Sequence, residues 1–196
     1  MRILQHPHAI PVSYKAVRAL VPVMLESREN VTDVILHIGV AMGRKTFDLE
    51  CRANRRGYAD AEDMYGETMP DDRCSKDFHD CEETLSTMLD ADEILRLWLD
   101  DLRTSSGAAR QVALGRSDSA GGYICEYMFY DSLAWSARRN LAQRSVARSE
   151  RSVLFLHVPA WVAQDVEMGR KVTIALLRAI AHSWSTTKRY ATLVGA

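Results

Sequence analysis

Two short runs of almost wholly apolar residues constrain the fold of this chain more than any other feature. They are "VTDVILHIGVA" at 31–41 and "SVLFLHVPA" at 152–160. Runs of this kind are typical of strands in a parallel sheet that is covered on both faces. Helical spacing of apolar residues occurs around and between them, at 12–26, 83–103, 122–139 and 165–185. Helices that alternate with apolar strands predict an α/β protein with a mainly parallel sheet.

Weaker patterns add two more strands and one irregular region. The segment "KTFDLECRAN" alternates, with Phe47 and Leu49 on one side and Asp48 and Glu50 on the other, which predicts a half-buried strand. The segment "RQVAL" at 110–114 is a short strand candidate. The acidic, turn-rich residues 57–82 are interpreted as an excursion on the surface.

The first predicted helix has an apolar face that can be written from the sequence. Its expected members are Val12, Ala16, Ala19, Leu20 and Val23. Pro22 is expected to disturb the last turns of this helix, because proline lacks a backbone N–H and clashes with the preceding turn.

The length and net charge of the chain limit the kinds of function that it can have. The chain has 196 residues, which fits a single domain, and a formal net charge of −1 gives no global field for nucleic acid or membrane. The basic run "RRNLAQRSVARSER" at 138–151 is interpreted as a solvated face, with nucleic-acid binding as the alternative. We expect no nucleic-acid or membrane partner, and the sequence leaves the oligomeric state unknown.

Targeting signals and cysteine usage predict a cytoplasmic protein. We find no signal peptide in the sequence and no apolar run near the roughly 18 residues of a membrane span. The four cysteines, Cys51, Cys74, Cys81 and Cys125, lack the spacing of a disulfide scaffold. Reduced thiols in the cytosol are the simpler interpretation.

Three chemically active side chains fall where strands end or helices begin. Cys125 follows a Gly-Gly turn at the start of a predicted helix, whose N-terminus favours a thiolate. His157 lies near the end of the strand run at 152–160, and Glu50 ends the alternating strand. Sites of open parallel sheets gather at the carboxyl ends of strands. A thiol nucleophile, an imidazole base and an orienting carboxylate would together hydrolyse an amide.

Each of these residues also has a structural explanation. A buried cysteine is often a small apolar side chain, and a histidine at a strand end is often held by structural hydrogen bonds. Glu50 could pair with Arg44 or Arg52 instead of a histidine. Cys74, His79 and Cys81 invite a zinc interpretation, but C-x4-H-x-C is not a usual ligand spacing and a fourth ligand is missing.

At these positions the sequence resembles the pyroglutamyl peptidase I family, the pyrrolidone-carboxylate peptidases. The segment "SDSAGGYICEYMFYDSL" at 117–133 is similar to the family's thiol segment, and "VLFLHVP" at 153–159 to its histidine segment. The segment "DVILHIGVAMGRKTFDLECRAN" at 33–54 is similar to the family's apolar strand, Gly-x-Ala-x-Gly-Arg turn and glutamate. The order Glu, Cys, His also agrees.

The resemblance implies a fold, an activity and a set of roles. The fold is a three-layer α/β/α sandwich of the phosphorylase/hydrolase-like kind. The activity is that of a cysteine omega-peptidase, a thiol protease that hydrolyses the N-terminal pyroglutamyl amide bond of peptides. Cys125 is then the nucleophile, His157 the general base and acid, and Glu50 the orienting carboxylate. The family needs no metal or cofactor, so none is expected.

The sequence departs from the family at four places. Gly39-Val40-Ala41 stands where many bacterial members have Gly-Gln-Ala. The thiol segment reads Cys125-Glu126 instead of Cys-Asn, and "RRGYADAEDMYG" at 55–66 replaces an Arg-Ile-Pro-Asp-Asn segment. The family's opening strand and Gly-Phe-x-Pro-Phe loop, which covers the pyroglutamyl ring, have no counterpart. We therefore expect a single peptidase-like domain over 1–196 that is N-terminally incomplete relative to the family. The alternative is an inactive or truncated relative that keeps the triad residues but has an incomplete substrate pocket.

Overall fold

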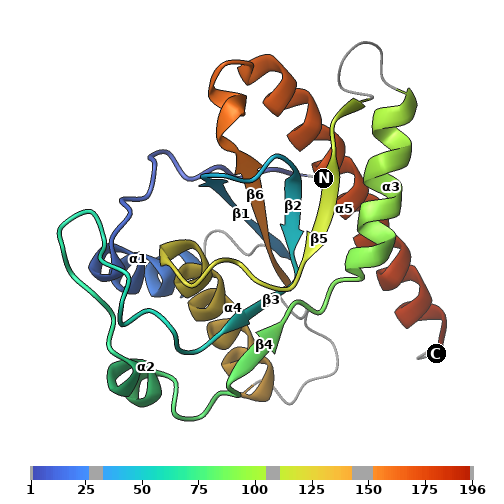
Figure 1. The fold of residues 1–196 in the computed structure, drawn as a ribbon. Helices are drawn as coiled ribbons and strands as arrows, with labels where there is room; N and C mark the ends of the chain where they lie inside the picture. The colour runs from blue at the N-terminus through green and yellow to red at the C-terminus, as the bar shows by residue number, and fades with distance from the viewer. Residues whose placement is uncertain (1, 27–32, 105–110, 143–151, 195–196) are drawn as a thin grey trace.

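The computed structural model describes residues 2–26, 33–104, 111–142 and 152–194. Its helices and strands alternate along much of the chain (Figure 1). In chain order they are α1 (Tyr14–Glu26), β1 (Val34–Ala41), β2 (Phe47–Glu50), β3 (Arg52–Asn54), α2 (Asp71–Asp77), β4 (Thr84–Ser86), α3 (Ala91–Thr104), β5 (Leu114–Ser117), α4 (Ile124–Ala142), β6 (Ser152–Pro159), the short 3₁₀ helix η2 (Ala160–Ala163) and α5 (Val166–Val194).

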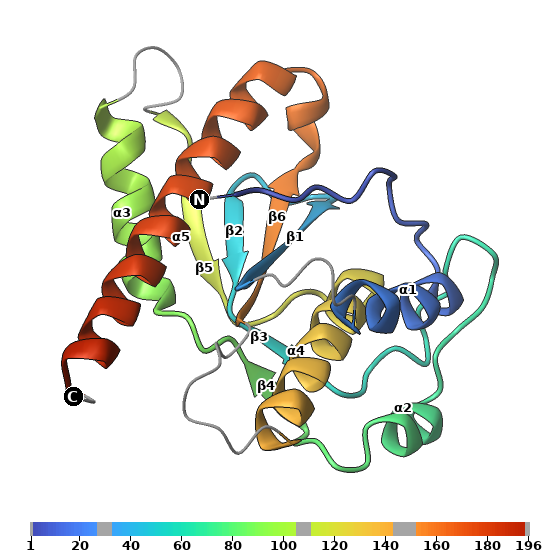
Figure 2. The same ribbon diagram turned by 180° about the vertical axis from the view of Figure 1, so that it is seen from behind.

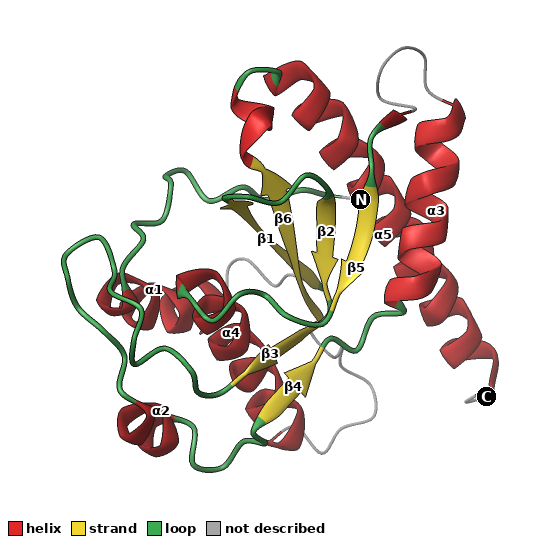
Figure 3. Ribbon diagram, in the orientation of Figure 1, coloured by secondary structure: helices red, strands yellow, loops and turns green. Residues whose placement is uncertain are grey.

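The main sheet has the strand order β1-β6-β2-β5. The pairs β1–β6 and β2–β5 are parallel, whereas β2 runs antiparallel to β6. β3 and β4 form a separate two-stranded antiparallel sheet below the main one (Figure 3). The prediction of an α/β fold with a mainly parallel sheet is confirmed.

Helices cover both faces of the main sheet, which makes three layers (Figures 1 and 2). α1 and α4 pack together on one face and α3 and α5 on the other. Successive side chains of β6 point to opposite faces of the sheet and so pack in two hydrophobic cores. Val153 and Phe155 belong to the core on the α1–α4 side, and Leu154 and Leu156 to the core on the α3–α5 side. The three-layer α/β/α arrangement implied by the resemblance is therefore confirmed.

β1 lies at the edge of the sheet, which corrects one expectation. The apolar run at 31–41 predicted a strand covered on both faces, but among the described residues β1 pairs only with β6. Ile38 and Val40 are 54% and 58% exposed, so the face of β1 to which they point is not fully covered. Apolar composition alone cannot separate a central strand from an uncovered edge strand.

The buried face of α1 also differs from the prediction. The helix buries Tyr14, Val17, Val21 and Leu25, which are spaced by three or four residues, whereas Val12 and Val23 are exposed. Tyr14 is the reason, because its ring packs against Tyr58 and Tyr127 and fixes the rotation of the helix. Pro22 lies inside the helix without ending it.

α3 begins later than its apolar spacing predicts. Residues 84–86 form β4, and the helix starts at Ala91, not near 83. Asp90 sets this start, because its carboxylate accepts a hydrogen bond from the backbone N–H of Glu93 at 2.9 Å in the manner of an N-cap. The region 57–82, predicted as a surface excursion, contains the short helix α2. No helix in the described part of the chain is long and apolar enough to cross a membrane.

Candidate active site

Alternation along β2 places Glu50 on the face of the sheet that α4 covers. Phe47 and Leu49 point into the α3–α5 core and are fully buried. Because successive side chains of a strand point to opposite faces, Asp48 and Glu50 point the other way. Glu50 is also fully buried, at 0% exposed, so this strand is covered more completely than the predicted half-buried strand.

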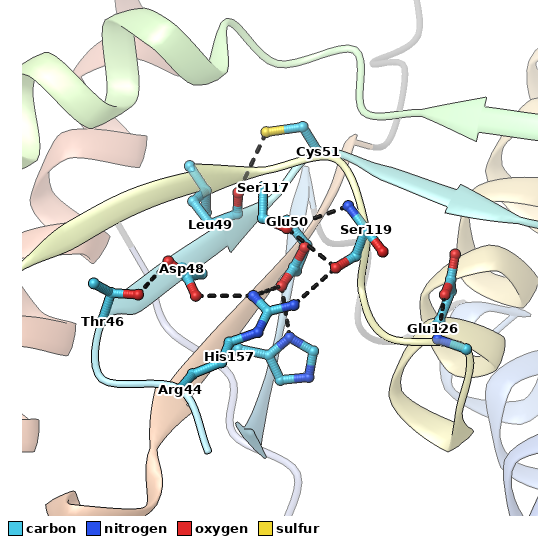
Figure 4. A network of polar contacts seen from close by, with 11 residues as sticks. Arg44, Thr46, Asp48, Leu49, Glu50, Cys51, Ser117, Ser119, Glu126 and His157 are labelled. Carbon is cyan, nitrogen blue, oxygen red and sulfur yellow. Dashed lines mark hydrogen bonds and ion pairs between the residues drawn. The ribbon is translucent and has the colours of Figure 1, made fainter. Parts of the chain in front are cut away.

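His157 and Glu50 are joined directly, as the sequence predicted for a base and its orienting acid. His157 Nδ1 lies 2.7 Å from Glu50 Oε1, and the imidazole is 3% exposed (Figure 4). The antiparallel register of β6 and β2, which sets Phe155 opposite Glu50, allows this diagonal contact. Since Nδ1 donates to the carboxylate, Nε2 is the nitrogen left to exchange a proton with a nucleophile.

Arg44 holds the same carboxylate, so the two alternatives for Glu50 are both realised. Arg44 Nη1 donates to Glu50 Oε1 at 2.5 Å and to Asp48 Oδ2 at 2.9 Å (Figure 4). Its Nη2 donates to the backbone carbonyl of Ser119 at 2.8 Å. Arg52, the other candidate partner, extends from the next strand and is exposed.

Cys125 lies against β1 at the level of His157. A Cβ atom added to Gly39 would stand 3.0 Å from Cys125 Sγ and 2.8 Å from Phe155 Cζ, so the thiol and this ring both approach the bare Gly39 backbone. Gly39 is in turn the register partner of His157 across the β1–β6 pair. Cys125 and His157 share no hydrogen bond in the described structure. The thiol is therefore near the dyad formed by His157 and Glu50 but not hydrogen-bonded to the imidazole.

The environment of Cys125 favours the neutral thiol at rest. Burial raises the pKa of Cys125 to about 11, the charge of Glu50 acts in the same direction, and the charge of Arg44 opposes it. The predicted benefit of the helix N-terminus is thus outweighed, because burial penalises the charged form. A nucleophilic role for this thiol would need a base to remove its proton during attack.

Glu126, which stands where the family has asparagine, organises the loop before α4. One oxygen, Oε1, accepts hydrogen bonds from the backbone N–H of Asn54 at 3.0 Å and from its side chain at 2.9 Å. The other, Oε2, accepts from the N–H of Gly122 at 2.6 Å. This resembles one half of a capping box, in which a glutamate at the third helical position accepts from the N–H of the N-cap residue; here Glu126 reaches Gly122, one residue before the N-cap. Gly121 and Gly122 have positive φ angles of 103° and 63°, which the turn before the helix requires.

The sequence suggests the three candidate catalytic residues, whose roles stay a prediction, and it assigns no supporting role to two residues that contact this region, Arg44 and Glu126. Arg44 was named only as an alternative partner of Glu50, although its spacing of six residues from Glu50 across a turn was a usable signal. Glu126 was noted only as a departure, and its contact with Asn54, 72 residues away, leaves no local pattern.

The remaining candidate residues stay apart from this cluster. Cys51, Cys74 and Cys81 are free thiols, like Cys125. His79 hydrogen-bonds to the backbone of Lys76 instead of meeting the two cysteines. Within the described ranges, no group of three or more histidine, cysteine or acidic residues is placed to hold a metal ion. Of the basic run at 138–151, Arg138 pairs with Asp80, and residues 143–151 lie outside the described residues.

Comparisons with known proteins point to one group of enzymes. No protein-family model matches the sequence. The human protein pyroglutamyl-peptidase 1 is 26% identical over 154 residues, which cover 79% of this chain and 61% of the human protein. The rat protein of the same name is 27% identical over 128 residues, covering 65% of this chain and 55% of the rat protein. The chain thus spans about three-fifths of the length of the curated relatives it matches.

Solved structures show the same fold. Pyrrolidone carboxyl peptidase from Thermococcus litoralis superposes with a TM-score of 0.68 at 17% identity, covering 91% of this chain and 78% of that one. A mutant form of the enzyme from Pyrococcus furiosus gives a TM-score of 0.66 at 19% identity and covers 88% of this chain and 79% of that one. Both superpositions cover about nine-tenths of this chain, so the α/β fold described above is shared with these structures.

Proposed function

We propose that this chain, a distant relative of pyroglutamyl peptidase I in sequence and in fold, is a cysteine peptidase that removes an N-terminal pyroglutamyl residue from peptides. The observation that carries the proposal is the 2.7 Å contact between His157 and Glu50, at the sheet level where Cys125 reaches Gly39. Such a buried acid–imidazole pair beside a thiol is the arrangement that nucleophilic acyl transfer requires.

Each of the three residues has one chemical task in this mechanism. Cys125 Sγ attacks the carbonyl carbon of the pyroglutamyl residue while its proton passes to Nε2 of His157. Because burial raises the pKa of the thiol to about 11, this proton transfer is part of the attack and not a preceding ionisation. Glu50 keeps Nδ1 protonated and stabilises the imidazolium that forms.

The second half of the reaction regenerates the thiol. His157 returns the proton to the leaving amine, the C–N bond breaks, and a thioester joins the pyroglutamyl group to Cys125. Water, deprotonated by His157, then attacks the thioester carbonyl and releases pyroglutamate, and the thiol regains its proton. Backbone N–H groups at the start of α4 are the candidate donors to the oxyanion, because the first N–H groups of a helix have no partner within it.

A second candidate function, an inactive relative that folds in the same way, is favoured by one observation. Cys125 makes no hydrogen bond to His157 in the described structure, and its neutral form is stabilised. Thiol–imidazole contacts that are long in a free enzyme often tighten when substrate binds. The two candidates differ in whether substrate completes the triad, which an activity measurement decides.

The test is hydrolysis of pyroglutamyl-aminocoumarin by the 196-residue chain. We expect release of the dye by the wild-type protein, and loss of that release, by roughly a thousandfold or more, in Cys125→Ser. Cys81→Ser is the matched control, because Cys81 is a partly buried free thiol outside the candidate site, and it should hydrolyse like wild type. A folded wild-type protein that releases no dye would favour the inactive relative, and hydrolysis that survives in Cys125→Ser would refute the mechanism.

A further inference from the structure

Arg44 joins three parts of the molecule that the candidate reaction needs to keep together. It lies in the turn after β1, and its guanidinium bonds to Asp48 and Glu50 on β2 and to the carbonyl of Ser119 in the loop after β5. That loop leads into α4, and Ser119 stands six residues before Cys125 in the sequence. One side chain thus contacts the acid of the dyad and also the segment that carries the thiol (Figure 4).

The charges around Glu50 make this contact necessary. Asp48 and Glu50 carry two negative charges when ionised, and Arg44 is the cation that contacts both. Glu50 is fully buried, and a buried carboxylate is costly unless a cation and hydrogen bonds compensate it. Glu50 Oε1 accepts from both Arg44 and His157, whereas the buried Oε2 has no hydrogen-bond partner among the residues that the structure describes. The orientation of Glu50 therefore rests on these two donors.

We propose that Arg44 is a positioning residue of the candidate triad, which fixes Glu50 against His157 and ties this dyad to the loop that carries Cys125. The inference rests on the proposed function and adds a residue to it. Arginine suits the task because its planar guanidinium offers several donors in fixed directions, whereas the ammonium of lysine is a single point of charge. Arg44 acts through Glu50 and the loop, not on the substrate.

The first experiment compares steady-state kinetics of Arg44→Met and Arg44→Lys with wild type. In Arg44→Met we expect kcat to fall roughly 10- to 100-fold, with KM changed by less than about twofold, because misplaced catalytic groups affect the chemical step more than binding. The kcat of Arg44→Lys should lie between those of wild type and Arg44→Met, because lysine keeps the charge but cannot bridge Asp48, Glu50 and the Ser119 carbonyl together. Arg96→Met, which removes an exposed arginine paired with Asp100 on α3, is the matched control and should match wild type.

The second experiment tests the effect of Arg44 on Cys125 through the reactivity of the thiol, and it needs no peptidase activity. The charges of Glu50 on β2 and Arg44 in the turn both act on the Cys125 thiol, and the Arg44 charge lowers its pKa. The thiol also lies against Gly39, whose register partner on β6 is His157. Without Arg44 the pKa of Cys125 rises further, so the thiolate fraction falls. We expect alkylation of Cys125 by iodoacetamide at pH 8.5, followed by peptide mass mapping, to be slower in Arg44→Met than in wild type and unchanged in Arg96→Met.

The outcomes separate the positioning role from the proposed function. Wild-type kcat in a folded Arg44→Met would overturn the positioning role alone, and a rise in KM at constant kcat would assign Arg44 to substrate binding instead. If wild type releases no dye while Arg44→Met still slows alkylation, the proposed function fails and the link between Arg44 and Cys125 stands. If Arg44→Met does not fold, Arg44→Lys decides: reduced kcat at constant KM supports the role, and wild-type kcat overturns it.

Discussion

At the scale of single residues, a buried carboxyl on α4 makes the stability of this protein depend on pH. Asp131 is 9% exposed, and burial raises the pKa of its carboxyl to about 7, with Arg138 and Arg18 opposing part of the rise and Asp77 adding to it. In the unfolded chain the same group has its ordinary pKa of 3.8. The folded state therefore binds this proton more tightly than the unfolded state. Its stabilising effect is complete below pH 3.8 and is lost as the pH rises through about 7.

Asp131→Asn should remove this loss of stability. The amide keeps the shape of the protonated acid, so we expect wild type and variant to have similar unfolding free energies at pH 4. At pH 8 the variant should be more stable, by something on the order of 1 to 4 kcal/mol. Urea unfolding at both pH values measures the difference. Asp72→Asn, on the exposed surface of α2, is the control and should show little pH-dependent difference from wild type. An equal effect of Asp131→Asn at both pH values would contradict the argument.

The residues of the candidate site differ in how far sequence could identify them. Cys125, His157 and Glu50 each carry a reactive group at the end of a predicted element, so type and position together suggested them. The 2.7 Å contact between His157 and Glu50 agrees with that prediction, whereas their catalytic roles stay a prediction. Arg44 and Glu126 could not be identified in this way, because each contacts a residue that is distant in the sequence and is brought near only by folding.

At the scale of elements, the close approach of β1, β6 and α4 depends on Gly39 having no side chain. A methyl group at this position would stand 2.8 Å from Phe155 Cζ and 3.0 Å from Cys125 Sγ. The distance to Phe155 Cζ is shorter than real Cβ contacts, so this ring must shift, and the Cys125 thiol must give way by a few tenths of an ångström. Overpacking of this kind typically costs about 1 to 3 kcal/mol.

Gly39→Ala should therefore lower both stability and activity. We expect the free energy of unfolding, measured in urea, to fall by about 1 to 3 kcal/mol. We also expect the rates of Cys125 alkylation and of dye release, each expressed per folded molecule, to fall. The matched control is Gly169→Ala on α5, whose added methyl group would stand 2.4 Å from Val162 Cγ1, away from Cys125. If Gly39→Ala changes stability but leaves both rates per folded molecule intact, the thiol does not depend on this contact.

Periodicity predicts whether a segment is a helix or a strand better than it predicts which elements that segment packs against. The predicted strands are found as β1 and β6, and the helix predicted at 122–139 is found as α4, because burial imposes a pattern that both sequence and structure share. The antiparallel direction of β2 relative to β6 could not be predicted, since alternation with period two is the same in either direction. The predicted buried face of α1 was wrong, because burying the large ring of Tyr14 determines the rotation of the helix more than burying several small apolar side chains does.

At the scale of the whole molecule, the main sheet ends at β1, beyond which the described residues form no further strand. The eight residues of this edge strand, "VILHIGVA", include no acidic or basic residue other than His37, which is buried and shares a hydrogen bond with Ser132. Beside the strand, a groove of about 1180 Å³ runs between β1, β6, α5 and residues 2–6, on the face opposite Glu50 and His157. Uncharged edge strands that expose apolar side chains are templates for association with other chains.

A charge on this edge should therefore oppose self-association without disturbing the fold. Ile38 is 54% exposed and lines the groove, so Ile38→Lys buries no charge and should change the free energy of unfolding by less than about 0.5 kcal/mol. Static light scattering over a range of protein concentrations should show less association than in wild type, because lysine on an edge strand discourages further pairing. Val23→Lys, at a 69% exposed position on α1, tests whether added positive charge alone is responsible, and it should scatter like wild type. Equal association in wild type and Ile38→Lys would mean that the open edge of β1 is not where copies of this chain meet.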